Sequence, residues 1–301
     1  MCDFKSSDSW VILSPLEQSI KRKVEAIGTP LRDWDINIYR GVLTGFNEAY
    51  IIDSNKREEI LANCTTPEEK KRTAELIRPI LRGRDIKRYG YDWANLWLIY
   101  VPWHFPLHKD PTIQGASAKA EETFKSQYPI IYQHLSKYKT QLAARNKAET
   151  GIRYEWYAMQ RWGANYSDDF FKPKIMYPNM TKYLPFYYDE KGFYQNDKSF
   201  MITGSNIAFL TAFLNSSLFK FCFIDNFPEL QGGTHELRKI FFDKIPVIQP
   251  NKEVENKFRS LVDDIQNEFT DEKAKLIDEM IFNLYNLTEQ ERKHIGYVEI
   301  K

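Results

Sequence analysis

The chain has 301 residues, of which 43% are hydrophobic and 15% aromatic, so it can bury the core of one large domain or of two closely packed ones. Its formal net charge is only +1, which excludes the uniformly basic character of a general nucleic-acid binder and confines any cationic surface to part of the chain. The cysteines, Cys2, Cys64 and Cys222, form no Cys-x-x-Cys or Cys/His cluster, which argues against a zinc site or a disulfide framework. The polar N-terminal residues and short apolar runs predict no cleavable signal and no membrane span, and we expect a soluble, reduced, cytoplasmic protein.

Three local patterns predict the first elements. Residues 14–28 have apolar side chains at helical spacing and end at Gly28, which predicts a helix. Residues 39–53 consist of two apolar arms around a glycine-rich turn, which predicts a β-hairpin. Residues 66–69, Thr-Pro-Glu-Glu, have the order of a capping box with proline at the first helical position, so a helix is expected from there toward Ile77.

The middle of the chain predicts a helical stretch followed by the main sheet. Helical spacing covers residues 118–145 with an interruption at Pro129, and short β-rich pieces separated by turn signals cover residues 154–204. An apolar helix is then expected over residues 206–224 and a flexible loop over residues 231–234.

The last fifty residues predict two amphipathic helices, 254–269 and 271–285, that pack as a hairpin, and a short third helix. The expected fold class is α+β, with a mixed β-sheet, flanking helices and a C-terminal helical hairpin. Three segments are expected: a lead-in helix and linker at 1–30, the sheet domain at 31–249 and the helical segment at 250–301.

Charge is distributed unevenly along the chain. Residues 67–90 hold eight Lys or Arg against four Asp or Glu, and residues 118–182 hold eleven against six. Residues 250–301 reverse the balance, with eight against twelve. Polyanion contact is therefore expected in the first two blocks, although solvated helix faces would give the same pattern.

Several motifs occur in an order that is similar to a known family. They are the 39–53 turn; Glu-Leu-Ile-Arg-Pro-Ile-Leu-Arg-Gly-Arg-Asp-Ile-Lys-Arg-Tyr at 75–89 with the strand-like 96–101; Lys-Pro-Lys-Ile-Met-Tyr at 172–177; Phe-Leu-Asn-Ser-Ser at 213–217; Gly-Gly-Thr-His-Glu-Leu-Arg at 232–238 with Lys-Ile-Pro at 244–246; and Leu-Tyr-Asn-Leu-Thr-Glu at 284–289. From about Leu31 to Ile295 the chain resembles the target-recognition region of adenine-specific DNA methyltransferases, in particular the TaqI-like C-terminal specificity domain of type IIG restriction-modification enzymes.

The resemblance implies sequence-specific recognition of double-stranded DNA beside the methyltransferase or endonuclease domain of a parent enzyme, with no membrane contact. The family's Asn-Pro-Pro-Tyr and Phe-x-Gly-x-Gly motifs, which hold a flipped adenine and S-adenosylmethionine, are absent from this sequence. This chain is therefore not expected to be an enzyme by itself or to bind a cofactor. S-adenosylmethionine, with magnesium as a second candidate, is expected in a catalytic part that lies N-terminal to Met1 or on another chain.

The expected DNA contacts are donor side chains on predicted loops and strand edges, because Lys, Arg and Thr suit phosphates and Arg or Asn can pair with base edges. These residues are Thr44, Asn47, Arg82, Arg84, Lys87, Arg88, Arg161, Lys172, Lys174, Thr234, His235 and Arg238. For the turn that contains Thr44 and Asn47, a structural role in a left-handed backbone is an equally good explanation. The 82–88 segment could instead be a solvated basic turn, and the two lysines at 172 and 174 an exposed strand edge.

Other functions fit less of the sequence. Asp168 or Asp169 with the carboxylates at 189–190 could hold a metal ion for a nuclease, but residues 189–192 are typical of a hairpin turn and the histidines lack metal-ligand spacing. A specificity subunit of a multi-subunit restriction system would carry a second recognition unit and long helices. A protein-interaction or assembly module fits the near-neutral charge but not the two basic blocks.

Overall fold

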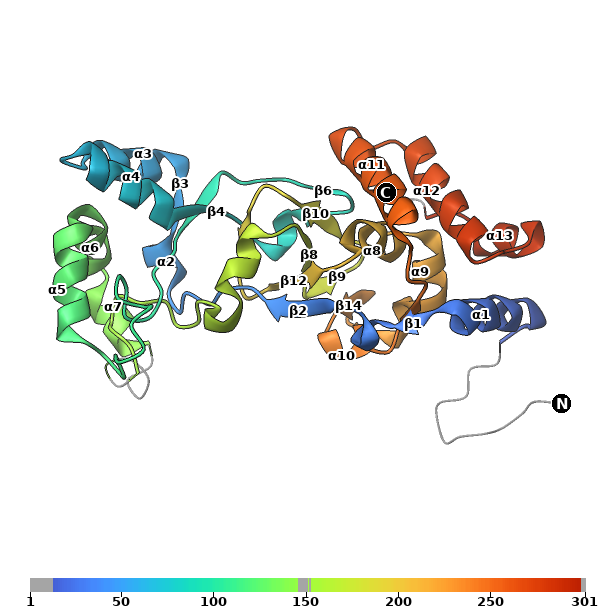
Figure 1. Cartoon of the computed structure of the whole chain (residues 1–301), viewed down its shortest axis with the longest axis horizontal. Helices are drawn as coiled ribbons and strands as arrows, with labels where there is room; N and C mark the ends of the chain where they lie inside the picture. The colour runs from blue at the N-terminus through green and yellow to red at the C-terminus, as the bar shows by residue number, and fades with distance from the viewer. Residues whose placement is uncertain (1–12, 146–150, 152, 299–301) are drawn as a thin grey trace. The chain divides into compact units, whose positions relative to one another are not determined.

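The computed structural model describes residues 13–145, 151 and 153–298, which are drawn as a coloured ribbon in Figure 1. The chain divides into two compact units. The central unit consists of Asp35–Ile207 and Glu229–Leu237, and the helical unit consists of the described parts of Met1–Trp34, Ala208–Pro228 and Arg238–Lys301. These boundaries differ from those of the three expected segments, because the lead-in helix and residues 208–228 group with the C-terminal helices.

Two four-stranded sheets organise the central unit (Figure 1). The first has the order β10-β8-β12-β2 and is antiparallel throughout; the second has the order β11-β4-β7-β3, in which β11 and β4 are parallel. The strands of the first sheet are β10 (Tyr187–Asp189), β8 (Lys174–Pro178), β12 (Ser199–Gly204) and β2 (Ile36–Arg40). Those of the second are β11 (Tyr194–Gln195), β4 (Ile77–Leu81), β7 (Leu96–Ile99) and β3 (Ile51–Asp53). Together with the helices, these sheets confirm the expected α+β class.

The predicted hairpin at 39–53 is wrong. Strand β2 pairs with β12, whereas β3 pairs with β7 in the other sheet, and the short helix α2 (Asn47–Tyr50) lies between them. At Gly41 the backbone runs closely along Asn196: a Cβ there would lie 2.1 Å from the Asn196 carbonyl oxygen, so the glycine serves this close approach and not a hairpin turn. Residues 189–192 likewise connect the two sheets and do not close a hairpin, because β10 and β11 belong to different sheets.

Helices pack around the second sheet (Figure 1). They are α3 (Ser54–Ala62), α4 (Pro67–Leu76), α5 (Ala118–Gln127), α6 (Pro129–Ser136) and α7 (Lys139–Ala144). Thr66 caps α4 by accepting a hydrogen bond from the Glu69 amide at 3.1 Å, but the Glu69 carboxylate accepts from the Thr65 amide at 2.9 Å, so only half of the predicted capping box forms. Pro129 interrupts the 118–145 stretch as expected, and a further break separates α6 from α7. Buried side chains such as Tyr50, Leu98 and Phe124 join helices and strands in one core.

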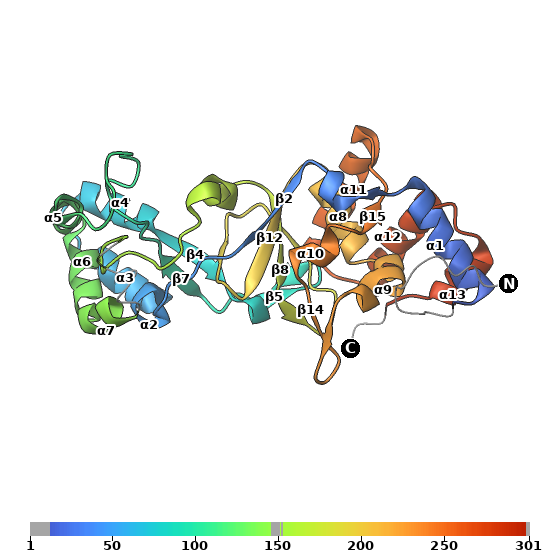
Figure 2. The ribbon, with the colours of Figure 1, turned by 90° about the horizontal axis from the view of Figure 1, so that it is seen from below.

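Short strands complete the central unit. One small sheet has the order β13-β14-β9, with β13 (Glu229–Leu230), β14 (Thr234–Glu236) and β9 (Met180–Thr181); another pairs β5 (Ile86–Lys87) with β6 (Gly90–Tyr91). The 3-10 helices η2 (Gly83–Asp85) and η3 (Ala164–Phe171) link the larger elements. The predicted loop at 231–234 is the tip of the β13-β14 hairpin, which Figure 2 shows projecting from the ribbon.

The helical unit contains the predicted C-terminal helices. Its elements are α1 (Pro15–Ile27), β1 (Thr29–Pro30), η1 (Leu31–Asp33), α8 (Ile207–Leu214, entering from the central unit), α9 (Ser217–Phe223), η4 (Ile224–Asn226), α10 (Lys239–Phe242), β15 (Pro246–Val247), α11 (Lys252–Asn267), α12 (Asp271–Leu284) and α13 (Glu289–Ile295). The expected apolar helix at 206–224 is broken in two, because Ser216 caps α9 by accepting from the Phe219 amide at 3.1 Å. Helices α11 and α12 pack together as predicted.

No single helix among the described residues is long and apolar enough to cross a membrane; the bent pair of α8 and residues 217–226 reaches that length and composition only jointly.

Buried carboxylates tie the helical unit together. Glu255 accepts hydrogen bonds from the Ala208 and Phe209 amides at 3.1 and 2.9 Å, at the beginning of α8 where an anion is favoured. Glu291 of α13 accepts from Ser19 Oγ at 2.7 Å and Lys23 Nζ at 2.6 Å, both on α1. Each carboxylate thus joins helices that are far apart in the sequence.

We expect Glu291 to make the helical unit sensitive to acid. Burial alone would raise its pKa, but the hydrogen bonds from Lys23, the Thr288 amide and Ser19 outweigh burial and lower the pKa to about 2 from 4.5. The stabilisation is therefore complete above about pH 4.5 and is lost as the pH falls toward about 2. Glu291→Gln should destabilise the protein by about 1.5–3 kcal/mol near pH 7. It should also reduce the loss of unfolding free energy between about pH 4.5 and about pH 2, which urea unfolding at several pH values measures. A variant that loses as much unfolding free energy over this pH range as the unaltered protein would contradict this assignment.

Candidate nucleic-acid interface

Lys174 does not lie at an exposed strand edge, so that expectation is wrong. Its Nζ is 2.6 Å from Asp189 Oδ2, and both side chains are 0% exposed. Nζ also donates to the Phe170 carbonyl at 2.8 Å, and burial lowers the pKa of Lys174 while the Asp189 carboxylate opposes that shift. Lys172, two residues earlier, is 61% exposed and pairs with Asp169 at 2.6 Å. Lys174 is the first residue of β8, whose five residues are all buried, whereas Lys172 precedes the strand and stays outside.

The turn that contains Thr44 and Asn47 is held by its own side chains. Thr44 is only 2% exposed, and its hydroxyl donates to Asn47 Oδ1 at 2.6 Å. Gly45 has φ +78°, and Arg145 donates to the Thr44 carbonyl. Thr44 is therefore engaged in the fold, whereas Asn47 remains exposed at the start of α2.

Within the basic motif, Arg82 is also a structural residue. Its Nε and Nη2 donate to the Asp85 carboxylate at 2.9 and 2.7 Å, and Asp85 accepts from the Arg82 amide at 2.8 Å as well. Asp85 is 4% exposed. This closed arrangement caps η2 and occupies the guanidinium that was expected to reach DNA.

The next cations of the motif point outward. Arg84 is exposed, and its guanidinium makes no hydrogen bond or ion pair with any residue that the structure describes. Lys87 is 51% exposed, donates to the Arg84 carbonyl at 3.0 Å and lies 3.6 Å from Asp92. The Arg88 guanidinium lies 5.5 Å over the ring of Tyr89. Arg84 and Lys87 are therefore available to an outside anion.

The fold places this motif beside segments that are distant in the sequence. A Cβ on Gly83 would lie 3.0 Å from the Lys198 carbonyl and 3.2 Å from Pro178, so η2 packs against the end of β8 and the turn that precedes β12. The Asn179 amide donates to the Lys198 carbonyl at 2.8 Å, and the Asn179 carbonyl accepts from the Leu237 amide at 2.7 Å. The motif, the turn at 196–198 and β9 with its partner β14 are therefore adjoining segments.

Four exposed cations on these segments form what we call the cation set. They are Arg84, Lys87, Lys182 and Lys198. Lys198 is 68% exposed, and its Nζ lies 3.7 Å from Asp197. Sequence reasoning missed Lys182 and Lys198, because neither belongs to a run of basic residues. Their signal is only their position beside turn residues, at the end of β9 and before β12.

The remaining predicted residues lie in different places. Thr234 and His235 are half-buried in β14, where His235 is opposite Thr181. Arg161 is exposed, and its side chain makes no hydrogen bond or ion pair with another described residue; its backbone pairs with Leu43. Arg238 is an exposed residue of the helical unit. The structure thus brings together some of the predicted contacts and not others.

We expect the motif's two arginines to behave differently when replaced. Arg82→Ala should destabilise the protein by about 1–3 kcal/mol, because it leaves the buried Asp85 carboxylate without its charged partner. Arg84→Ala should change the unfolding free energy by less than about 0.5 kcal/mol, because its side chain is exposed. Denaturant unfolding of both variants measures the difference, and equal losses would contradict the structural role of Arg82.

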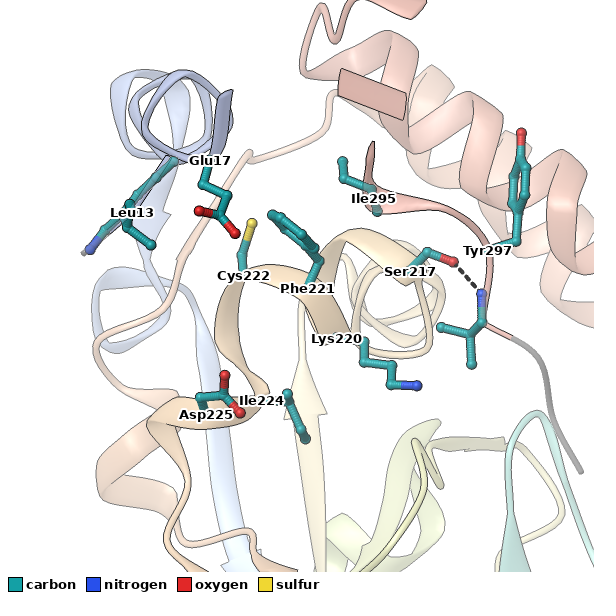
Figure 3. A pocket seen from close by; sticks show the side chains of 12 residues that line it. Leu13, Glu17, Ser217, Lys220, Phe221, Cys222, Ile224, Asp225, Ile295 and Tyr297 are labelled. Carbon is teal, nitrogen blue, oxygen red and sulfur yellow. Dashed lines mark hydrogen bonds between the residues drawn. The ribbon is translucent and has the colours of Figure 1, made fainter. Parts of the chain in front are cut away.

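Across 13–145, 151 and 153–298, no group of three or more His, Cys, Asp or Glu side chains could hold a metal ion. A hollow of about 510 Å³ lies in the helical unit between α1, α9 and residues 295–298 (Figure 3). Figure 3 shows Cys222 and Glu17 facing this space, but burial raises the pKa of the Cys222 thiol to about 12, so it stays protonated and is not an activated nucleophile. Cys64 is also a free thiol, and Cys2 lies outside the described residues.

The central unit combines one antiparallel and one mixed sheet with exposed cations on loops, and comparison places the chain in the class of restriction-modification specificity domains. The chain belongs to the family of TaqI-like C-terminal specificity domains, whose family model matches residues 78–247. This confirms the resemblance seen in the sequence. The chain is also similar to the Type II methyltransferase M.MjaIV of Methanocaldococcus jannaschii, with 25% identity over 242 residues, which cover 75% of this chain and 69% of that protein.

Two solved structures share the fold. The type IIG restriction endonuclease BpuSI matches with a TM-score of 0.50 and 13% identity, covering 91% of this chain and 34% of that one. The type IIL restriction-modification enzyme MmeI, solved in complex with DNA, matches with a TM-score of 0.54 and 11% identity, covering 87% of this chain and 34% of that one. The chain therefore spans about a third of the length of these two structures.

Proposed function

We propose that the central unit recognises a specific sequence in double-stranded DNA and supplies that specificity to a restriction-modification enzyme. The observation that carries this proposal is that the family match at 78–247 contains the whole cation set, Arg84, Lys87, Lys182 and Lys198. Three adjoining segments that are separate in the sequence carry these exposed cations. Such a placement suits contact with successive phosphates of one nucleic acid.

Base reading requires side chains other than those that hold phosphates. Arg161 is exposed without a hydrogen bond or ion pair from the described residues, so its guanidinium is free to form the paired hydrogen bonds that select guanine. Asn47 is exposed; its Oδ1 already accepts from the Thr44 hydroxyl at 2.6 Å, so its Nδ2 is the group left to donate to adenine. In this proposal the cation set fixes the position of the duplex, and Arg161 and Asn47 discriminate between sequences.

Catalysis belongs to a methyltransferase or endonuclease part outside these 301 residues. In this proposal S-adenosylmethionine, with magnesium as a second candidate, binds that separate part, because this sequence lacks the Phe-x-Gly-x-Gly segment that holds S-adenosylmethionine in the family. The specificity domain would bind DNA so that the target adenine reaches the separate catalytic pocket. This chain's own role is then binding and positioning.

The test is binding of the whole chain to a pool of mixed-sequence duplexes across a salt series without added metal. We expect affinity to fall steeply as salt rises, with a logarithmic slope of about −0.9 for each phosphate neutralised. Bound duplexes can then be sequenced to find an enriched site. No binding at low salt would contradict DNA recognition by the isolated chain and favour an assembly module, and binding without an enriched site would contradict sequence specificity.

A further inference from the structure

We propose that a hollow in the central unit holds one nucleotide of the DNA whose base is unstacked from the duplex. This inference rests on the proposed DNA-binding function. The hollow has a volume of about 400 Å³, within the usual range for small-molecule sites. It is bordered by α4, the start of β4, the segment after β7, and η3. It lies wholly within the central unit and is separate from the cation set.

Aromatic rings that contact one another line the hollow. Tyr100 meets Trp162 at 6.4 Å between ring centroids and Tyr194 at 4.9 Å, and its hydroxyl donates to the Trp162 carbonyl at 2.8 Å. Phe171 lies 6.1 Å from Tyr194 and is 55% exposed. The first three rings are therefore held in place, while Phe171 presents an uncovered face. A nucleobase can stack on such a ring whatever its sequence.

Cations outnumber carboxylates at the rim. Arg72, Arg78 and Lys109 line the hollow together with one acidic residue, Glu75. The Arg78 guanidinium lies 5.1 Å over the ring of Phe171 and makes no hydrogen bond or ion pair with the rest of the described chain. This charge favours an anionic ligand and disfavours a cationic one. A planar ring that carries a phosphate satisfies both the aromatic wall and the rim.

A strand of DNA and a free nucleotide offer the same chemistry, and the neighbouring residues favour DNA. Arg161 directly precedes Trp162 and is exposed; Lys172 directly follows Phe171 and is 61% exposed, where a phosphate would compete with its ion pair to Asp169. A free mononucleotide needs one phosphate contact, whereas a strand continues past its unstacked nucleotide and needs several. The flanking pair therefore fits a phosphate backbone that enters and leaves the hollow.

The experiment measures binding of the whole chain to three probes: a fully paired duplex, the same duplex with one extra unpaired nucleotide, and deoxyadenosine monophosphate. We expect the bulged duplex to bind at least about tenfold more tightly than the paired one, because one base gains an aromatic partner. Phe171→Ala and Arg78→Ala should reduce this preference to about twofold or less. Both should leave the affinity for the paired duplex nearly unchanged. The matched control, Arg84→Ala, should weaken both duplexes equally and keep the preference.

The outcomes distinguish a failure of the hollow inference from a failure of the proposed DNA-binding function. If the paired duplex binds with the expected salt dependence but the bulge confers no preference, the hollow inference fails and the proposed function stands. A preference for the bulged duplex that persists in Phe171→Ala and Arg78→Ala also overturns the hollow inference, because the unstacked nucleotide would then lie elsewhere. A third outcome is that the monophosphate binds, that Phe171→Ala abolishes this binding, and that the bulged duplex is not preferred. This outcome would assign the hollow to a free nucleotide and overturn the inference that it holds a nucleotide of DNA. If none of the three probes binds, both the hollow inference and the proposed function are overturned.

Discussion

Asp189→Ala is expected to destabilise the central unit by about 3–5 kcal/mol, because it leaves the buried Lys174 charge without its partner. The Asp189 carboxylate also accepts hydrogen bonds from the Lys191 and Phe193 amides, each at 3.0 Å, so the substitution removes the anchor of the turn after β10 as well. Urea unfolding, followed by the fluorescence of the tryptophans, measures the loss. A loss of this size is a large part of the stability of a typical domain.

A second variant tests whether the lost stability comes from the broken ion pair or from the lost packing of the side chain. Lys174→Met with Asp189→Leu removes both charges and should recover part of the stability lost in Asp189→Ala, because an apolar pair does not leave a buried charge uncompensated. Lys172→Ala is the surface control. It should lower the unfolding free energy by no more than about 1 kcal/mol, because the Lys172 side chain, which pairs with Asp169, is 61% exposed. Losses in the double variant equal to the sum of the single losses would contradict a coupled pair.

The combined substitution of Arg84, Lys87 and Lys198 by alanine is expected to have the largest effect on DNA binding. Each of these exposed side chains that neutralises a phosphate contributes about one unit to the salt slope, so the slope should become shallower by up to about three. Each of the three replacements should weaken binding at low salt by about three- to tenfold, so the combined loss of affinity is about 30- to 1,000-fold. Binding to the duplex pool across the salt series measures both quantities, and circular dichroism checks that the variant is folded.

The matched control removes the same charge from the acidic end of the chain. Lys252, Lys257 and Lys275 are exposed residues of α11 and α12, and their combined replacement by alanine lowers the net charge by the same amount. We expect this control to bind DNA nearly as the unaltered protein does, because it leaves the cation set intact. Equal weakening in both triple variants would show that net charge, and not this set of residues, governs binding.

Local signals correctly predicted several elements. The helix over residues 14–28 and the cap at Thr66 form where the sequence predicts them, and α11 and α12 follow the predicted amphipathic periods. The break at Pro129 is also where the sequence places it. These features depend on hydrogen bonds and side-chain contacts between residues three or four apart, so a short stretch of sequence contains all the partners.

The candidate site was only partly predictable. Exposed Arg84 and Lys87 follow from a local basic run, but Arg82 is paired with Asp85 three residues later, a local signal that the basic pattern obscured. Lys182 and Lys198 join the cation set only because η2 packs against the end of β8 and the turn at 196–198, beside which β9 begins. Aromatic residues such as Tyr100 and Phe171 carry no sequence signal for the hollow, because they are spread over separate segments.

The order of residues alone was enough to predict several of the helices, the α+β class, the uneven charge and the specificity-domain family. Tertiary structure decided that β2 and β3 enter different sheets, that Lys174 is buried against Asp189, and that exposed cations from three segments adjoin. The physical reason is the range of the interactions. Caps and helical periods are satisfied within a few residues, whereas strand partners and the environment of a charge come from residues that only the folded chain brings into contact.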